Sequence, residues 1–276
     1  MRWKQFSTPV KDTEPKAVEA YIEEHGEESF TLLDVRQPKE YEMFRIPGAK
    51  LIPLPELPDR VDELPSEKPV IVYCAMGGRS NAAAQFLAGK GFKDVQNLRG
   101  GAEAWQGHSA EGPANMGMFL LKGNETPAEI IQIAYGLEEG LKEFYTVLSA
   151  KPENAPVANL LTQLSKIEEK HKQRLFNLYL TFDPGPADKD AFERTIMSEV
   201  MEGGLTTEEF LEQNKPVMQT AADVLNIAMM LEAQAMDLYM RYAEKSKDEN
   251  VRKILFGLAD EEKAHLKSLG NLLDKL

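Results

Sequence analysis

The order of hydrophobic and polar residues differs between the two halves of the chain. In the first half, up to about residue 107, three short apolar runs are typical of buried strands. They lie at residues 30–35, 70–74 and 94–98. Amphipathic stretches at 13–26 and 79–92 separate them, and we expect Thr13 to cap the first of these helices. Strands that alternate with helices predict an α/β domain with a parallel sheet flanked by helices.

From Pro127 onward the apolar residues recur with the period of a helix. Four long stretches have this period, at residues 127–150, 155–181, 217–246 and 248–274. The segment 183–215 predicts one or two short helices within a long crossover, which suits an all-α four-helix bundle with a crossover connection. The predicted domains are therefore an α/β domain at 1–107, a linker rich in glycine and proline at 108–126, and the bundle at 127–276.

Composition and charge narrow the classes of function. The 276 residues carry a net charge of −13, and they contain no lysine or arginine cluster that would attract a phosphate backbone. We expect no nucleic-acid partner. No apolar run is long enough to cross a bilayer, so we expect no membrane span. The sequence begins without a secretory signal and has one cysteine, which predicts a protein of the reducing cytoplasm.

The second half repeats itself at an offset of 94 residues. IAYGLEEGLKEFY (133–145) aligns with IAMMLEAQAMDLY (227–239), and LSKIEEKHKQRL (164–175) aligns with LADEEKAHLKSL (258–269). The matching polar pairs are Glu138 with Glu232, Tyr145 with Tyr239, Glu168 with Glu262, and His171 with His265. Because residues three apart share a helix face, each Glu-x-x-His can direct a carboxylate and an imidazole at one point.

In a four-helix bundle these residues would bring four carboxylates and two imidazoles into the core. Burying ionised carboxylates costs several kcal/mol each, and two divalent cations would supply the opposing charge. A single Glu-x-x-His is weak evidence for a metal. Two of them in register with two further glutamates predict a dinuclear site, whereas the methionines nearby, such as Met229 and Met236, are expected to fill the core.

This second half resembles the ferritin-like domain of rubrerythrins. The resemblance implies two iron ions, with manganese or zinc as alternatives, that react with hydrogen peroxide or dioxygen. It implies that Glu138, Glu168, His171, Glu232, Glu262 and His265 are the ligands, with Tyr145 and Tyr239 hydrogen-bonded behind them. It also implies a homodimer. The chain has no Cys-x-x-Cys pair and no carboxylate at Ala235, so the electrons would come from an external reductant such as rubredoxin. The alternative is an iron-handling module without redox turnover.

The single cysteine, Cys74, leaves the carboxyl end of a predicted strand in VIVYCAMGGRSNAAAQFL. A lone cysteine is often inert packing. Here, however, Gly77 and Gly78 let the backbone turn its N–H groups inward, and a helix beginning near Ser80 adds its positive end. The loop Ala75, Met76, Gly77, Gly78 and Ser80, together with Arg79, is therefore expected to stabilise a thiolate or persulfide and to lower the pKa of Cys74.

The first half resembles single-domain rhodaneses. The matching pieces are Leu33 to Arg36, IPGAKLIPL (46–54), CAMGGRS (74–80) and GGAEAW (100–105). The resemblance implies that Cys74, assisted by Arg79, takes sulfane sulfur from thiosulfate or a persulfide and passes it to a thiol acceptor. A cysteine phosphatase would have five residues between cysteine and arginine, and this loop has four. A sensory or docking domain without activity is the other alternative.

Overall fold

The computed structural model describes residues 10–113, 124–150, 155–182, 188–196 and 206–275. Residues 114–123 of the predicted linker and residues 183–187 and 197–205 of the predicted crossover lie outside it. The chain forms two compact units. The first consists of Met1–Asn115, Glu232–Arg241 and Phe256–Ala264, and the second of Met116–Leu231, Tyr242–Leu255 and His265–Leu276. The predicted domain boundaries stay predictions.

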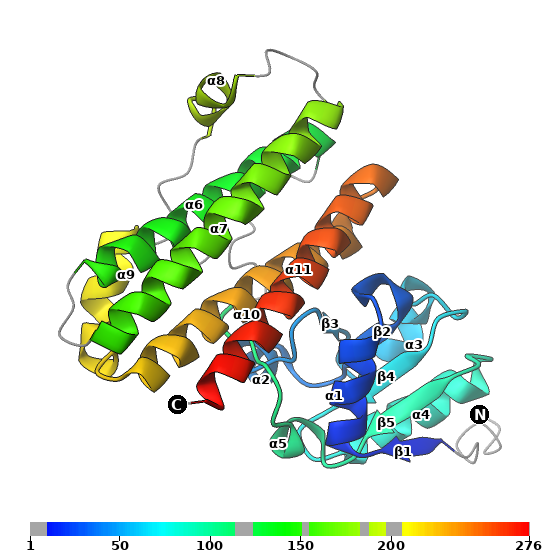
Figure 1. Cartoon of the computed structure of the whole chain (residues 1–276). Helices are drawn as coiled ribbons and strands as arrows, with labels where there is room; N and C mark the ends of the chain where they lie inside the picture. Colours follow the sequence, from blue (N-terminus) through cyan, green and yellow to red (C-terminus); the bar gives the residue numbers. More distant parts are fainter. Residues whose placement is uncertain (1–9, 114–123, 151–154, 183–187, 197–205, 276) are drawn as a thin grey trace. The chain divides into compact units, whose positions relative to one another are not determined.

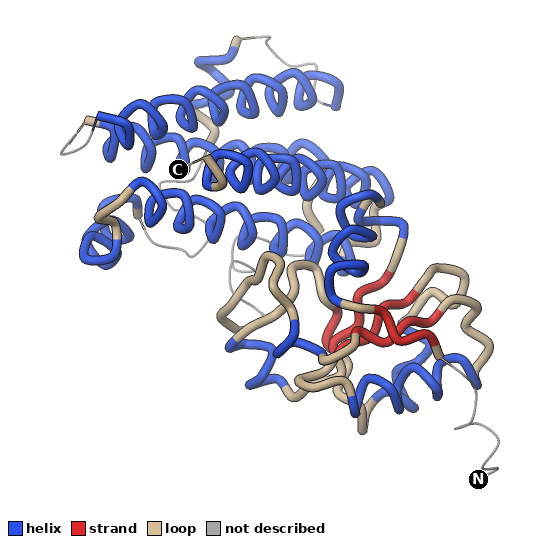
Figure 2. Tube along the Cα trace, turned by 60° about the horizontal axis from the view of Figure 1, so that its bottom comes forward, coloured by secondary structure: helices blue, strands red, loops and turns tan. Residues whose placement is uncertain are grey.

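The α/β part contains a parallel sheet, drawn as red segments in Figure 2. Its strands are β1 (Lys11–Thr13), β2 (Thr31–Asp34), β3 (Lys50–Leu51), β4 (Val70–Tyr73) and β5 (Val95–Leu98), in the spatial order β1-β5-β4-β2-β3. Parallel strands need crossovers, and helices supply most of them (Figure 1). These are α1 (Pro15–Glu24), α2 (Pro38–Met43), α3 (Leu57–Arg60), α4 (Gly78–Gly89) and, after β5, α5 (Gly101–Ala104).

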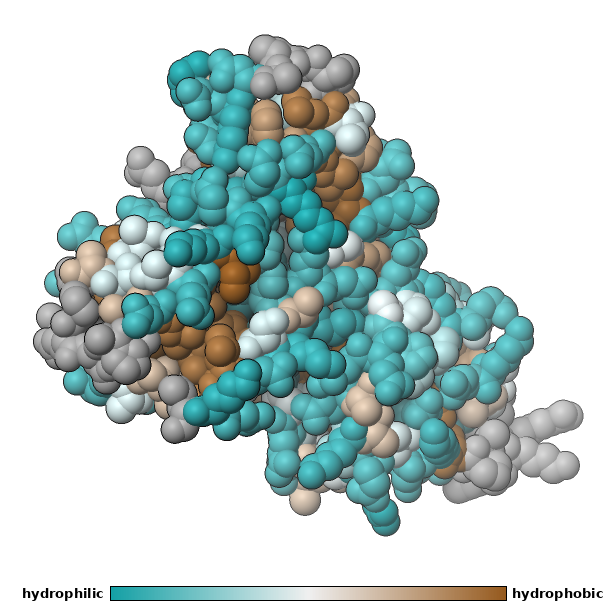
Figure 3. Space-filling model, in the orientation of Figure 1, coloured by the Kyte–Doolittle hydropathy of each residue, from teal (hydrophilic) through white to brown (hydrophobic). Residues whose placement is uncertain are grey.

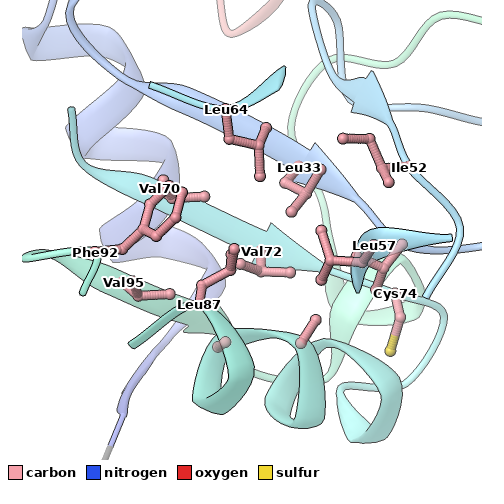
Figure 4. Packing of buried hydrophobic residues seen from close by; sticks show 13 residues of the cluster. Leu33, Ile52, Leu57, Leu64, Val70, Val72, Cys74, Leu87, Phe92 and Val95 are labelled. Atoms are coloured by element: carbon pink, nitrogen blue, oxygen red, sulfur yellow. The ribbon is translucent and has the colours of Figure 1, made fainter. Parts of the chain in front are cut away.

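Alternation along the strands divides the core between the two faces of the sheet. Leu33 and Val72 pack with Leu87 of α4 in one cluster, which Figure 4 shows. Their neighbours along the strands, Leu32 and Ile71, belong to a second cluster with Val18 of α1. Because successive side chains point to opposite faces, a continuous apolar strand buries both of them, as the sequence pattern predicted.

The predicted cap at Thr13 is wrong. Thr13 is the last residue of β1, where it pairs with Leu98, and its hydroxyl donates a hydrogen bond to Gln96 Oε1 at 2.8 Å. Helix α1 begins after Glu14, whose side chain forms no capping bond. Strand β1 escaped prediction because Lys-Asp-Thr is polar and short, so it lacks the apolar signal of a strand.

The second half is mostly helical. Its long helices among the described residues are α6 (Pro127–Ser149), α7 (Ala155–Phe182), α10 (Ala221–Lys245) and α11 (Glu249–Leu273). Two short helices, α8 (Lys189–Glu193) and α9 (Thr207–Asn214), lie in the predicted crossover. One hydrophobic cluster of the second unit takes Phe144 from α6, Leu164 from α7, Leu225 from α10 and Leu269 from α11. A shared core of this kind is that of a helical bundle, and the predicted fold class is confirmed.

The internal repeat extends to the helix starts. Thr126 and Glu129 form a capping box at the start of α6, and Thr220 and Asp223 form one at the start of α10. Each threonine hydroxyl accepts a bond from the backbone N–H three residues later, which satisfies a donor that the first turn leaves open. The two boxes are separated by the same 94-residue offset as the ligand pairs. The repeat therefore fixes where both helices begin.

Candidate functional sites

Cys74 lies at one end of the apolar cluster that Figure 4 shows, with its sulfur beside the first turn of α4. The residue is 1% exposed. Its Sγ accepts hydrogen bonds from the Gly77 N–H at 3.1 Å and from the Ser80 hydroxyl at 3.3 Å. Helix α4 begins at Gly78, two residues before the expected start. The predicted loop thus surrounds the sulfur with donors.

These donors change the acidity of the thiol. Burial alone would raise the pKa of Cys74, because a thiolate loses its hydration. Hydrogen bonds from the Ser80 hydroxyl and from the N–H groups of Ser80, Met76 and Gly77 act in the opposite direction, and the pKa of Cys74 lies below its ordinary value. The cradle therefore favours a thiolate, as expected from the glycine loop.

Two glycines give the loop its shape. Gly77 has a φ of +97°, a left-handed conformation that favours glycine. Gly101, at the start of α5, has a φ of +60°, and a Cβ there would lie 2.2 Å from the Cys74 carbonyl oxygen. That close approach lets Ala102 N–H donate to the Cys74 carbonyl at 2.7 Å and Glu103 N–H donate to the Ala75 carbonyl at 3.0 Å. The GGAEAW motif thus holds the cysteine loop in place through these two backbone hydrogen bonds.

Arg79 has a partner that the sequence did not reveal. Its guanidinium donates two bonds to the carboxylate of Glu40 on α2, at 2.6 and 2.8 Å. The hydrogen bonds from Arg79 hold the pKa of Glu40 at about 2. Glu40 also accepts from the Gln37 N–H at the start of α2, which fixes its position. The positive charge of Arg79 is therefore neutralised next to the cysteine loop.

The predicted metal ligands meet in two groups. In the first, Glu168, His171 and His265 each offer a ligand atom within 4.8 Å of the others, and in the second Glu232, Glu262 and His265 do so. The His171 and His265 rings are stacked with centroids 3.8 Å apart. Glu138 joins the first group through a 3.5 Å approach of its Oε2 to His171 Nδ1. Tyr145 and Tyr239 are buried.

Burial and charge shape the environment of these carboxylates. The side chains of Glu138, Glu168, Glu232 and Glu262 are all buried. Burial would raise the pKa of Glu138, but its hydrogen bonds to His171 and Glu168 and the attraction of both imidazoles hold that pKa below its ordinary value. Carboxylate oxygens and imidazole nitrogens are donors that suit iron, manganese and zinc. The chemistry of this donor set fits a divalent cation.

One flank of the first group differs from its repeat counterpart. Lys172 follows His171 and is buried, whereas the repeat has Leu266 at that place. Its ammonium ion pairs with Glu139, lies 3.6 Å from Glu169 and 3.7 Å from Glu193, and faces the Tyr135 ring. This network was not predicted from the sequence. The sequence does contain a signal for it, because Lys172 is charged whereas Leu266, at the same position of the second repeat, is apolar.

Comparison with known proteins follows the same division of the chain. The family model of the rhodanese-like domain matches residues 14–108, and that of rubrerythrin matches residues 223–276. A sulfurtransferase of Allochromatium vinosum is 40% identical over 81 residues, which cover 29% of this chain and 76% of that protein. The thiosulfate sulfurtransferase GlpE of Coxiella burnetii (strain RSA 493 / Nine Mile phase I) is 38% identical over 84 residues, which cover 30% of this chain and 78% of that protein.

The uncharacterized protein YqhL of Bacillus subtilis (strain 168) is 45% identical over 76 residues, or 28% of this chain, and the match spans 60% of YqhL. A parallel sheet with a cysteine cradle after its central strand, followed by a bundle with carboxylate and histidine clusters, defines a two-part protein. The chain belongs to the rhodanese family through its first half, and residues 223–276 of its second half match the rubrerythrin family model. Among the described residues, none of the helices has the length and apolar character needed to span a membrane.

Proposed function

We propose that the first half is a sulfurtransferase in which Cys74 carries the sulfur. The observation that carries this proposal is the pair of hydrogen bonds to Cys74 Sγ from the Gly77 N–H and the Ser80 hydroxyl. The same donors would hold the terminal sulfur of a persulfide, which is also an anion. The names of two related sulfurtransferases support the proposal.

The transfer proceeds in two balanced steps. The Cys74 thiolate attacks the sulfane sulfur of thiosulfate, a new S–S bond forms, and the old S–S bond breaks so that sulfite leaves with the electron pair. A thiolate acceptor then attacks the outer sulfur of the Cys74 persulfide, takes that sulfur as its own persulfide, and restores the Cys74 thiolate. Neither step changes the total number of electrons, so no external oxidant is needed.

The test of this half uses the single cysteine. After treatment with thiosulfate, mass spectrometry should show one added sulfur on the wild-type chain and none on Cys74→Ser. Ser66→Ala, at a half-buried turn residue, is the matched control and should gain sulfur as the wild type does. Transfer of sulfur to cyanide or to a thiol by Cys74→Ser would contradict the proposal, and loading without transfer would favour a sensory domain.

We propose that the second half holds two iron ions through Glu138, Glu168, His171, Glu232, Glu262 and His265. The two clusters of ligand atoms within 4.8 Å contain five of these residues, and Glu138 Oε2 lies 3.5 Å from His171 Nδ1, which supports this set. When bound, the iron supplies two-electron chemistry toward hydrogen peroxide or dioxygen. The protein contributes buried carboxylates that neutralise the ions and aliphatic and aromatic side chains of the bundle that limit access of water. Tyr145 and Tyr239 are buried as well, and we propose that they donate hydrogen bonds to the ligands.

Metal analysis of the full chain, together with an ultraviolet and visible spectrum, tests this second half. We expect two iron ions in each chain, oxidation by one addition of peroxide, and repeated turnover only when a reductant such as rubredoxin is present. Manganese or zinc in place of iron would change the metal without changing the ligands. Bound iron that peroxide does not oxidise would favour the iron-handling alternative. A doubly substituted chain, Glu168→Ala with His171→Ala, that still bound two ions would refute the ligand set.

We also propose a homodimer of the reducing cytoplasm. The single cysteine is consistent with that compartment. Figure 3 shows a face covered largely by hydrophilic residues, with hydrophobic residues gathered over parts of the helical region. Light scattering measures the mass directly, and a monomeric mass would exclude the dimer without affecting either chemical site.

A further inference from the structure

Two stretches of the C-terminal helices belong to the same compact unit as the sheet. They are Glu232–Arg241 of α10 and Phe256–Ala264 of α11. The first stretch begins with the proposed ligand Glu232, and the second contains the proposed ligand Glu262. Polar contacts within this unit connect each stretch to a loop of the α/β part.

Asp237 makes the first connection. Its side chain is fully buried, and its Oδ2 accepts from Arg45 Nε at 3.0 Å, from Arg45 Nη2 at 2.8 Å and from Arg241 Nε at 2.7 Å. Its Oδ1 accepts from the Gly48 N–H at 3.0 Å. Arg45 is also fully buried, and its Nη1 donates to the Gly112 carbonyl at 2.7 Å. A carboxylate with four donors between two guanidinium groups has one well-defined position.

The backbone around Gly48 is shaped for this contact. Gly48 has a φ of +73°, and a Cβ at this residue would lie 1.9 Å from Met240 Cε. Only a glycine lets α10 approach the loop so closely. The motif IPGAKLIPL, on which the rhodanese resemblance rests, therefore also contacts α10 in this chain.

Lys263 makes the second connection. Its Nζ donates to the carbonyls of Ile22 at 3.0 Å and His25 at 2.8 Å, which lie at the carboxyl end of α1, and to Glu27 Oε1 at 2.8 Å. One turn earlier, Asp260 Oδ1 accepts from the Glu27 N–H at 3.3 Å. An ammonium group at the carboxyl end of a helix satisfies carbonyls that have no partner within the helix. The segment after α1 thus holds one turn of α11.

We propose that Asp237 and Lys263 are positioning residues for the metal ligands Glu232 and Glu262, and that metal binding and the folding of the α/β part stabilise each other through them. The inference rests on the proposed metal site. The proposal gives a reason for joining the two parts in one chain, because the loops that contact Asp237 and Lys263 belong to the rhodanese part.

Helix geometry supplies the argument for this coupling. Lys263 directly follows Glu262, and Asp237 follows Glu232 by five residues, or about 7.5 Å along the helix axis at about 1.5 Å a residue. Metal–ligand distances tolerate changes of only about 0.2 Å. A helix transmits a shift or rotation of one turn to the next, so a loss of either contact would displace a ligand by more than a metal ion accepts. By linkage, the metal ion must stabilise the same contacts.

Cobalt(II) binding to the full chain tests the proposal, because the visible spectrum of cobalt reports its ligand geometry. Lys263→Met removes the three hydrogen bonds, and Lys263→Arg keeps the charge. The matched control is Lys253→Met, an exposed lysine on the same helix. We expect Lys263→Met to bind one of two cobalt ions about 10- to 100-fold more weakly, with an altered spectrum, and Lys263→Arg to restore most of both. Lys253→Met should match the wild type.

A folded Lys263→Met chain with wild-type cobalt affinity and spectrum would overturn the proposal. If that variant does not fold, hydrogen exchange of the wild-type chain decides. Cobalt should slow exchange of the Gly48 and Glu27 amides, which donate to Asp237 and Asp260, and unchanged exchange at both would overturn the proposal. A wild-type chain that binds no cobalt, iron or manganese would instead refute the proposed metal site.

Discussion

Replacement of Ser80 by alanine removes one of the donors to the Cys74 sulfur. The hydroxyl lies 3.3 Å from Sγ and is fully buried, so water cannot take its place without rearrangement. A hydrogen bond to a charged group contributes about 1.5 to 3 kcal/mol, and one pKa unit corresponds to about 1.4 kcal/mol. We therefore expect Ser80→Ala to raise the pKa of Cys74 and to make its thiolate about 10- to 100-fold scarcer at a pH below that pKa.

The rate of alkylation by iodoacetamide, measured against pH, gives this pKa, because only the thiolate reacts and the chain has no other cysteine. At a pH below the pKa of both proteins, the variant should react about 10- to 100-fold more slowly than the wild type, because its thiolate is scarcer by that factor. Ser66→Ala is the control and should leave the profile unchanged. A Ser80→Ala profile that coincides with the wild-type profile would refute the role assigned to the hydroxyl.

Three further predictions concern charge. Glu40→Gln frees the Arg79 guanidinium, so the KM for the dianion thiosulfate should fall in steady-state assays, and an unchanged KM would show that Arg79 does not meet the donor. Burial raises the pKa of Glu27 from 4.5 to about 7, although the charge of Lys263 acts in the opposite direction. Between these two pH values the folded chain keeps a proton that the unfolded chain has already lost. Stability of up to about 3 kcal/mol that is present below pH 4.5 should therefore be lost as the pH rises through 7. Urea unfolding of wild type and Glu27→Gln at both pH values measures this, and equal pH dependence would contradict it. Chelation of the metal should lower the melting temperature of the bundle at neutral pH, because buried carboxylates then lack opposing charge, and calorimetry that finds no change would argue against a buried site.

Local patterns explain why much of the fold could be predicted. The apolar residues of β2 and β4 are buried on both faces of the sheet, and that environment leaves a direct trace in the sequence, whereas β5 also buries Gln96 and Asn97. The short strands β1 and β3 leave no such trace, since register with a neighbouring strand, rather than hydrophobicity, defines them. The prediction of a cap at Thr13 failed because a threonine before a proline-containing helix start has the same pattern in either role.

The candidate sites divide in the same way. The repeat placed Glu168 and His171 on one helix face, and this follows from spacing alone. The pairing of Arg79 with Glu40, 39 residues apart, depends on how α2 and α4 meet, and no periodicity encodes it. The bond between Arg45 and Asp237 joins residues 192 apart in sequence. Contacts of this kind depend on tertiary packing, so only the structure reveals them.

Native mass spectrometry of the full chain tests the central claim most directly. The chain would be loaded anaerobically with ferrous iron, treated with thiosulfate, and compared with Cys74→Ser prepared in parallel. We expect one species that carries both two iron ions and one additional sulfur, and a Cys74→Ser chain that keeps the iron and lacks the sulfur. A wild-type chain that gains no sulfur, or that retains no iron, would contradict the claim that one chain combines a sulfur carrier with a dinuclear metal site.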